Sequence, residues 1–124
     1  MKHITFILNP ISGTVSKAGI PALIEERVDR SKFTFSIEET QYAGHGTEIA
    51  AQAAYRGDDI VVAVGGDGTV NEVGKGLINT DTALGILPCG SGNGLARHLM
   101  IPMNAAKALD IINDNYDDYD CVVI

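Results

Sequence analysis

The chain has 124 residues, a length typical of one domain, and its content of 45% hydrophobic and 20% charged residues is that of an ordinary globular protein. The net charge of −7 disfavours a nucleic-acid partner and gives no general attraction to an anionic membrane surface. The apolar runs are too short to form a transmembrane segment, no signal peptide is recognisable, and Cys89 and Cys121 predict neither a disulfide framework nor a zinc site. We therefore expect a cytoplasmic protein.

The first half of the chain predicts two strands that alternate with two helices. Residues 4–8 are a compact run of β-forming residues, and apolar residues then recur at helical spacing over residues 20–28. Residues 33–37 alternate between apolar and polar as in a strand. A short helix is expected over residues 49–54, behind a glycine-rich turn at residues 44–46.

The second half continues the same alternation. Residues 60–64 form a continuous β-branched run, which is typical of a strand buried on both faces in a parallel sheet. A helix over residues 70–78, a strand over 83–87, a helix over 105–112 and the beginning of a strand at 121–124 follow. The order predicts an α/β fold, a three-layer Rossmann-like domain with a mostly parallel sheet between helices. Because the chain ends within an apolar strand, we expect the natural protein to continue.

Polar or glycine-rich loops follow several of these strands. They occupy residues 9–13, 65–69 and 90–94, and Thr40 with the turn at residues 44–46 follows a fourth strand. In open parallel sheets, ligands bind beyond the carboxyl ends of the strands. The sequence therefore predicts a ligand cleft at one edge of the sheet.

The loop at residues 65–69 has the composition of a phosphate site. Glycines let the backbone approach a bulky anion, and a helix that begins near Val70 would add amide donors and a positive dipole end. Asp67 would repel phosphates unless Mg²⁺ lies between them, or unless it accepts a proton from an attacking hydroxyl. A purely structural alternative is a capping box, in which Thr69 and Glu72 cap the helix without any ligand. The buried strand before the loop and the two further polar loops favour the phosphate site.

Other nucleotide and metal motifs fit poorly. Residues 68–76 miss the Walker A spacing by one residue and have Gly76 in place of Ser or Thr, and no dinucleotide fingerprint opens the first helix. Protein-kinase HRD and DFG motifs are absent, and the histidines lack metal-ligand spacing.

Four ordered motifs resemble those of the diacylglycerol kinase catalytic family, which includes sphingosine, ceramide and bacterial lipid kinases. Residues 65–72 (GGDGTVNE) match its GGDGTxNE motif, and residues 9–13 (NPISG) look like its NPxSG. Thr40 with the GHG turn is similar to the T…GHA segment, and residues 88–97 (PCGSGNGLAR) to PxGTGNDxAR. Ser91 replaces the usual threonine and keeps a hydroxyl.

The resemblance implies a nucleotide-binding N-terminal domain like that shared by NAD kinases and diacylglycerol kinases. It implies that Asp67 is catalytic and holds Mg²⁺, directly or through water. The ATP contacts that it implies are Asn9, Thr40, Gly66, Asp67, Gly68, Thr69, Val70, Asn71, Glu72 and Ser91.

The resemblance also implies what the remainder of the protein does. An ATP-dependent lipid kinase of this family transfers the γ-phosphate to a lipid hydroxyl, a step of phospholipid metabolism. A β-rich, lipid-binding domain would follow Ile124. Residues 1–124 alone would therefore bind nucleotide weakly and transfer no phosphate. The complete protein would contact membranes only transiently. Two alternatives stay open, an NAD kinase-type phosphotransferase, because GGDGT also occurs there, and a non-catalytic nucleotide-binding module.

Overall fold

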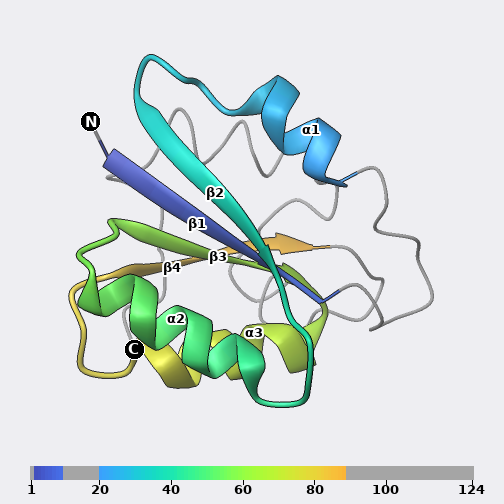
Figure 1. Ribbon diagram of the computed structural model, residues 1–124, viewed down its shortest axis with the longest axis vertical. Coiled ribbons are helices and arrows are strands. Elements are labelled where there is room, and N and C mark those ends of the chain that lie inside the picture. The colour runs from blue at the N-terminus through green and yellow to red at the C-terminus, as the bar shows by residue number, and fades with distance from the viewer. Residues whose placement is uncertain (1, 10–19, 89–124) are drawn as a thin grey trace.

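The computed structural model describes residues 2–9 and 20–88, which form a parallel sheet with helices on both faces (Figure 1). Within these residues there are four strands and three helices. In chain order they are β1 (Lys2–Leu8), α1 (Ile20–Arg27), β2 (Phe33–Glu39), α2 (His45–Tyr55), β3 (Ile60–Gly65), α3 (Asp67–Leu77) and β4 (Ala83–Pro88).

The strand order is β2-β1-β3-β4, and all three strand pairs are parallel. Leu8, the last residue of β1, lies opposite Glu39 of β2 and Val64 of β3, so the carboxyl ends of these strands are level. Parallel neighbours require crossover connections, which the helices supply. α1 covers one face of the sheet, while α2 and α3 cover the other (Figure 1).

The core lies around the two central strands. Every residue of β3 is buried, as is β1 from Ile4 to Leu8, because helices shield both faces of the sheet. α3 turns Val70, Val73 and Leu77 into this core at helical spacing. The α/β fold expected from the sequence is confirmed.

Helix α3 begins earlier than its apolar pattern indicates. The pattern predicts a start near Val70, but the helix includes Asp67, Gly68 and Thr69 and has Gly66 as its N-cap. α2 likewise begins at His45, ahead of the expected residues 49–54. Glycines and polar residues carry no hydrophobic periodicity, so the pattern alone misses first turns that are exposed.

The helix predicted over 105–112 and the strand at 121–124 lie outside the described residues. Among the residues that the structure does describe, no helix is long and apolar enough to cross a membrane.

Candidate functional site

The carboxyl ends of β1 and β3 form the switch point of the sheet. After β1 the chain passes to α1 on one face, and after β3 it passes to α3 on the other face (Figure 1). Ligands in open α/β sheets bind in the crevice that these diverging connections leave. Asn9 and Gly65 lie at this point, because Leu8 and Val64 are paired. We refer to this end of the strands as the carboxyl edge.

The end of β2 brings Thr40 to the same place. The amide of Thr40 donates to the carbonyl oxygen of Leu8 over 2.9 Å. The structure therefore gathers Asn9, Thr40 and the start of α3 at the carboxyl edge. Ser91 lies outside the described residues, so its predicted role stays a prediction.

Gly65 is a glycine that the backbone requires. Its φ is +153°, a conformation that L side chains rarely adopt, and a Cβ there would lie 2.8 Å from the hydroxyl oxygen of Thr69. The position fixes how the chain turns from β3 into α3.

Gly66 and Gly68 differ from Gly65, because the backbone does not require them to be glycine. Gly66 has φ −93° and ψ −166°, which any residue adopts, and Gly68 lies inside α3. A Cβ on either would meet no described atom within 4 Å. Glycine within a helix destabilises it by up to about 1 kcal/mol relative to alanine. As far as residues 2–9 and 20–88 are concerned, the missing side chains therefore leave open space directly at the start of α3.

The start of α3 presents hydrogen-bond donors to this space. The first helical amide bond runs from Val70 to the carbonyl oxygen of Gly66 over 3.1 Å, so the amides of Gly68 and Thr69 have no acceptor one turn back. The Thr69 hydroxyl is buried and has no hydrogen-bond partner among the described residues. Together with the positive end of the helix dipole, these groups form a site suited to an anion such as phosphate.

The capping-box alternative is wrong. Thr69 is the third residue of α3 rather than its N-cap, its hydroxyl caps nothing, and the N-cap Gly66 has no side chain with which to cap. The Glu72 carboxylate lies against a different helix. One of its oxygens accepts hydrogen bonds from the amides of Gly44 at 3.1 Å and Gly46 at 3.3 Å, at the start of α2.

The start of α2 is thus closed to an external anion, whereas the start of α3 is not. The His45 amide donates to the Tyr42 carbonyl oxygen at 3.1 Å, and the Thr47 amide donates to that of Gly44 at 3.1 Å. Glu72 satisfies the two amides that remain in this turn. The start of α2 therefore already holds a carboxylate of the chain itself.

The remaining predicted contacts fall on one short stretch of α3. Asp67 and Asn71 are exposed, while Val70 is buried in the core and could contact a ligand only through its backbone. Among residues 2–9 and 20–88, no group of three or more His, Cys, Asp or Glu side chains could hold a metal ion. A metal at Asp67 would therefore need further oxygen ligands from outside this group, such as those of a bound phosphate.

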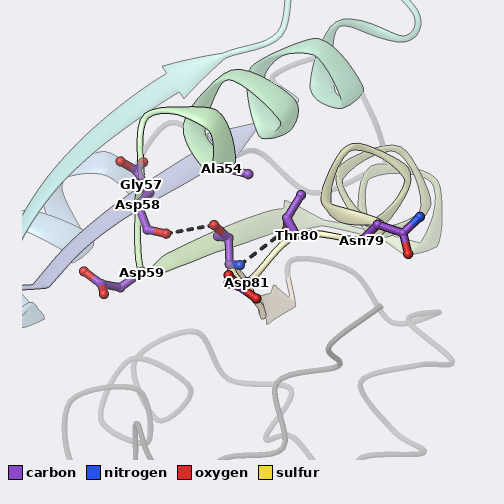
Figure 2. Close-up of a pocket in the computed structure, with 8 residues that line it drawn as sticks. Ala54, Gly57, Asp58, Asp59, Asn79, Thr80 and Asp81 are labelled. Atoms are coloured by element: carbon purple, nitrogen blue, oxygen red, sulfur yellow. Dashed lines mark hydrogen bonds between the residues drawn. The ribbon is translucent and has the colours of Figure 1, made fainter.

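A second polar site lies at the opposite, amino edge of the sheet, and no motif in the sequence predicted it. A cavity of about 400 Å³ is lined by Ala54 of α2 and by loop residues that precede β3 and β4, among them Asp58, Asp59 and Asp81 (Figure 2). It lies one strand length from Gly65, roughly 17 Å at 3.3 Å per residue. The carboxylate of the buried Asp58 accepts hydrogen bonds from Arg56 at 3.1 and 3.0 Å and from the Thr5 hydroxyl.

The environment of Asp58 keeps its carboxyl group ionised. Burial, the largest single influence, raises its pKa, but the hydrogen bonds from Arg56 and Thr5 and the charges of Arg56 and His3 together lower the pKa below its ordinary value. The Thr82 hydroxyl donates to the backbone oxygen of Asp58 over 2.8 Å (Figure 2). These contacts join the loops at the amino edge, which is a structural role.

Comparison with known proteins identifies the family. The family model described as "Diacylglycerol kinase catalytic domain" matches residues 3–124. The chain belongs to this family. It is 37% identical over 115 residues to a diacylglycerol kinase of Bacillus subtilis (strain 168), covering 90% of this chain and 38% of the relative. A diacylglycerol kinase of Staphylococcus aureus (strain Newman) is 34% identical over 119 residues, with 93% of this chain and 37% of the relative covered.

A solved structure shows the same fold. The crystal structure of a diacylglycerol kinase from Bacillus anthracis str. Sterne matches with a TM-score of 0.73 and 27% identity, over 90% of this chain and 39% of that one. The chain thus spans less than half the length of the family members that it matches. Its membership of a kinase family agrees with the resemblance seen in the sequence motifs.

Proposed function

We propose that this chain is the nucleotide-binding part of an ATP-dependent lipid kinase, which transfers the γ-phosphate of ATP to the hydroxyl group of a lipid such as diacylglycerol. The observation that carries the proposal is the start of α3. It lies at the switch point of the sheet, and among the described residues its first amides and the buried Thr69 hydroxyl have no partner and its two glycines leave open space. The names of the relatives supply the class of reaction.

Phosphoryl transfer depends on holding the phosphates and neutralising their charge. In the proposed site, the amides of Gly68 and Thr69 and the Thr69 hydroxyl bind phosphate oxygens, and Asn9 approaches them from the end of β1. Thr40 lies toward the nucleoside. Asp67 either helps to hold Mg²⁺ against the phosphates or accepts the proton of the lipid hydroxyl. When bound, Mg²⁺ would offset the negative charge of the phosphates.

The lipid is proposed to bind elsewhere in the complete protein. The relatives extend to more than twice the matched length, and a β-rich domain after Ile124 would present the lipid hydroxyl to this site. The complete protein would be cytoplasmic and contact membranes transiently. Residues 1–124 alone are expected to bind ADP with Mg²⁺ weakly and to transfer no phosphate.

Gly68→Ala tests the binding site directly. Alanine stabilises a helix relative to glycine, so this variant should raise the free energy of unfolding by up to about 1 kcal/mol. Its methyl group would nevertheless occupy the space proposed for phosphate, so the affinity for ADP with Mg²⁺ should fall. Calorimetric titration and thermal unfolding of the same samples measure both effects.

The control is Lys75→Ala, a change to an exposed residue at the other end of α3. It should leave ADP binding unchanged. A wild-type chain that gives no binding heat, or a Gly68→Ala variant that binds as well as the wild type, would contradict the proposed phosphate site.

The reaction itself is tested with the complete gene product. It should phosphorylate diacylglycerol with ATP and leave NAD unmodified. Phosphorylation of NAD, with none of the lipid, would instead favour an NAD kinase-type activity.

A further inference from the structure

Glu72 joins the middle of α3 to the start of α2 through three hydrogen bonds. Its carboxylate accepts from the amides of Gly44 at 3.1 Å and Gly46 at 3.3 Å, and its backbone oxygen accepts from the Thr47 hydroxyl at 2.7 Å. Bonds from amides to an ionised acceptor are stronger than bonds between neutral groups. Glu72 therefore fixes the turn at residues 44–47 relative to α3.

The two glycines of this turn are adapted to receive the carboxylate. Gly44 has φ +87°, which only glycine adopts readily. A Cβ on Gly46 would lie 3.2 Å from the Glu72 carboxylate oxygen and 3.4 Å from its Cβ, so a larger residue would press against it. The close approach of Glu72 is thus a specific feature of this turn.

The turn that Glu72 holds continues from Thr40, one of the predicted nucleotide contacts. A Cβ on Gly46 would lie 3.8 Å from the Thr40 methyl carbon, so the two residues are in near contact. Within the segment, the Gln41 amide donates to the His45 ring over 2.9 Å, and the Tyr42 and His45 rings stack at 4.4 Å. The segment of residues 40–46 is therefore a compact unit, and Glu72 attaches it to α3.

We propose that Glu72 is a positioning residue, which holds the segment of residues 40–46 in place relative to the start of α3 and thereby aligns the nucleoside and phosphate parts of the site. This inference rests on the proposed function. It departs from the direct nucleotide contact expected from the sequence, because the carboxylate is engaged by two amides. An additional carboxylate against a phosphate would also be repulsive.

Two conservative variants separate positioning from direct contact. Glu72→Gln keeps the length of the side chain and an oxygen that can accept from both amides, but it loses the charge. Glu72→Asp keeps the charge, but it is one methylene too short to reach the turn. If Glu72 acts through the turn, the Glu72→Gln variant should bind ADP with Mg²⁺ about as tightly as the wild type. The Glu72→Asp variant should bind it more weakly, on the order of tenfold.

A combined variant tests whether the effect passes through Thr40. The losses of affinity in Glu72→Asp and Thr40→Ala should not add in the double variant, because both variants weaken the proposed contact between Thr40 and the nucleoside. Glu26→Asp, on exposed residue 26 of α1, is the matched control and should bind ADP like the wild type. Binding is measured by calorimetry at a temperature where circular dichroism shows every variant to be folded.

Three results would overturn the inference. If Glu72→Gln weakens ADP binding and Glu72→Asp does not, the charge of Glu72 acts on the ligand directly. If the losses of Glu72→Asp and Thr40→Ala add fully, Glu72 does not act through Thr40. If Asp lowers the melting temperature but leaves the affinity for ADP unchanged, Glu72 has a structural role alone. Failure of the wild type to bind ADP would instead overturn the proposed function, and this inference with it.

Discussion

Asp58 is a buried charge whose neighbours decide whether it stabilises the fold. Its side chain is 4% exposed, and it forms a two-point contact with Arg56 in addition to its bond from the Thr5 hydroxyl. Replacing Asp58 would leave Arg56 and the Thr5 hydroxyl without their ionised acceptor. Because Arg56 is half exposed, part of that loss is recovered by water.

We predict that Asp58 contributes stability that is lost in acid. The ordinary pKa of its carboxyl group is 3.8 and its pKa in the folded protein is lower, so the unfolded state binds a proton first as the pH falls. The contribution is therefore fully present above about pH 5 and disappears as the pH falls below 3.8 through the folded pKa. Asp58→Asn should lower the free energy of unfolding at pH 7 by about 1–3 kcal/mol and flatten its decline in acid.

Denaturant unfolding at several pH values between 7 and 3 measures this effect. Asp81→Asn, on an exposed residue of the same cavity, is the control and should keep the acid dependence of the wild type. An Asp58→Asn variant with an unchanged slope below pH 4 would show that other carboxylates dominate acid unfolding.

At the residue scale, the sequence predicted which residues gather but not all of their partners. The spacing of the motifs placed Asn9, Thr40 and residues 66–72 near one another, and the structure brings them together. It could not assign the carboxylate of Glu72, because the amides that it contacts lie 28 and 26 residues earlier in the chain. Local spacing made a capping box plausible, but α3 begins before Thr69 and the Glu72 carboxylate bonds to the start of α2.

At the element scale, the packing of α2 on α3 depends on Gly76. A Cβ there would lie 2.4 Å from the backbone oxygen of Thr47 and 2.8 Å from the Ala50 Cβ. Neither atom can move without shifting the α2 backbone. In the sequence, Gly76 was notable only for spoiling a Walker A match, whereas in the fold it lets the two helices lie in close contact.

We predict that Gly76→Ala destabilises the protein although alanine favours helices. The gain in helix propensity is at most about 1 kcal/mol, whereas forcing a methyl group into a packed interface typically costs about 1–3 kcal/mol. The net change should be a loss of stability, measured as a lower midpoint in urea. Lys75→Ala, one residue earlier and exposed, is the control for the same helix. An unchanged or higher urea midpoint for Gly76→Ala would mean that α2 can shift away from α3 without loss of stability.

The existence of each described element followed from its pattern, while the helix starts did not. A continuous run of β-branched residues, as at residues 60–64, predicts a buried strand. The first turns of α2 and α3 instead consist of glycine and polar residues, and the turn that opens α2 is bonded to Glu72 of α3. Such contacts are tertiary, so a pattern read along the chain cannot include them.

At the scale of the whole molecule, the two edges of the sheet have different roles. The amino edge has a cavity of about 400 Å³, but Asp58, which lines it, bonds to Arg56 and to the hydroxyls of Thr5 and Thr82. Within the part of the chain that the structure describes, the carboxyl edge has unsatisfied donors at the start of α3, and it lies at the switch point. Unsatisfied donors and a favourable dipole indicate where an anionic ligand binds.

We predict that nucleotide protects the carboxyl edge and leaves the amino edge unchanged. In hydrogen–deuterium exchange of the chain with ADP and Mg²⁺, peptides covering residues 65–70 should exchange more slowly, because phosphate oxygens would accept from the amides at the start of α3. Peptides covering residues 56–59 and 79–82, which line the cavity, should exchange as without ligand. Gly66→Val, whose side chain would fill the space ahead of the helix, should abolish the protection. Slower exchange confined to the amino edge would mean that the nucleotide binds in the cavity, and it would contradict the proposed phosphate site at the start of α3.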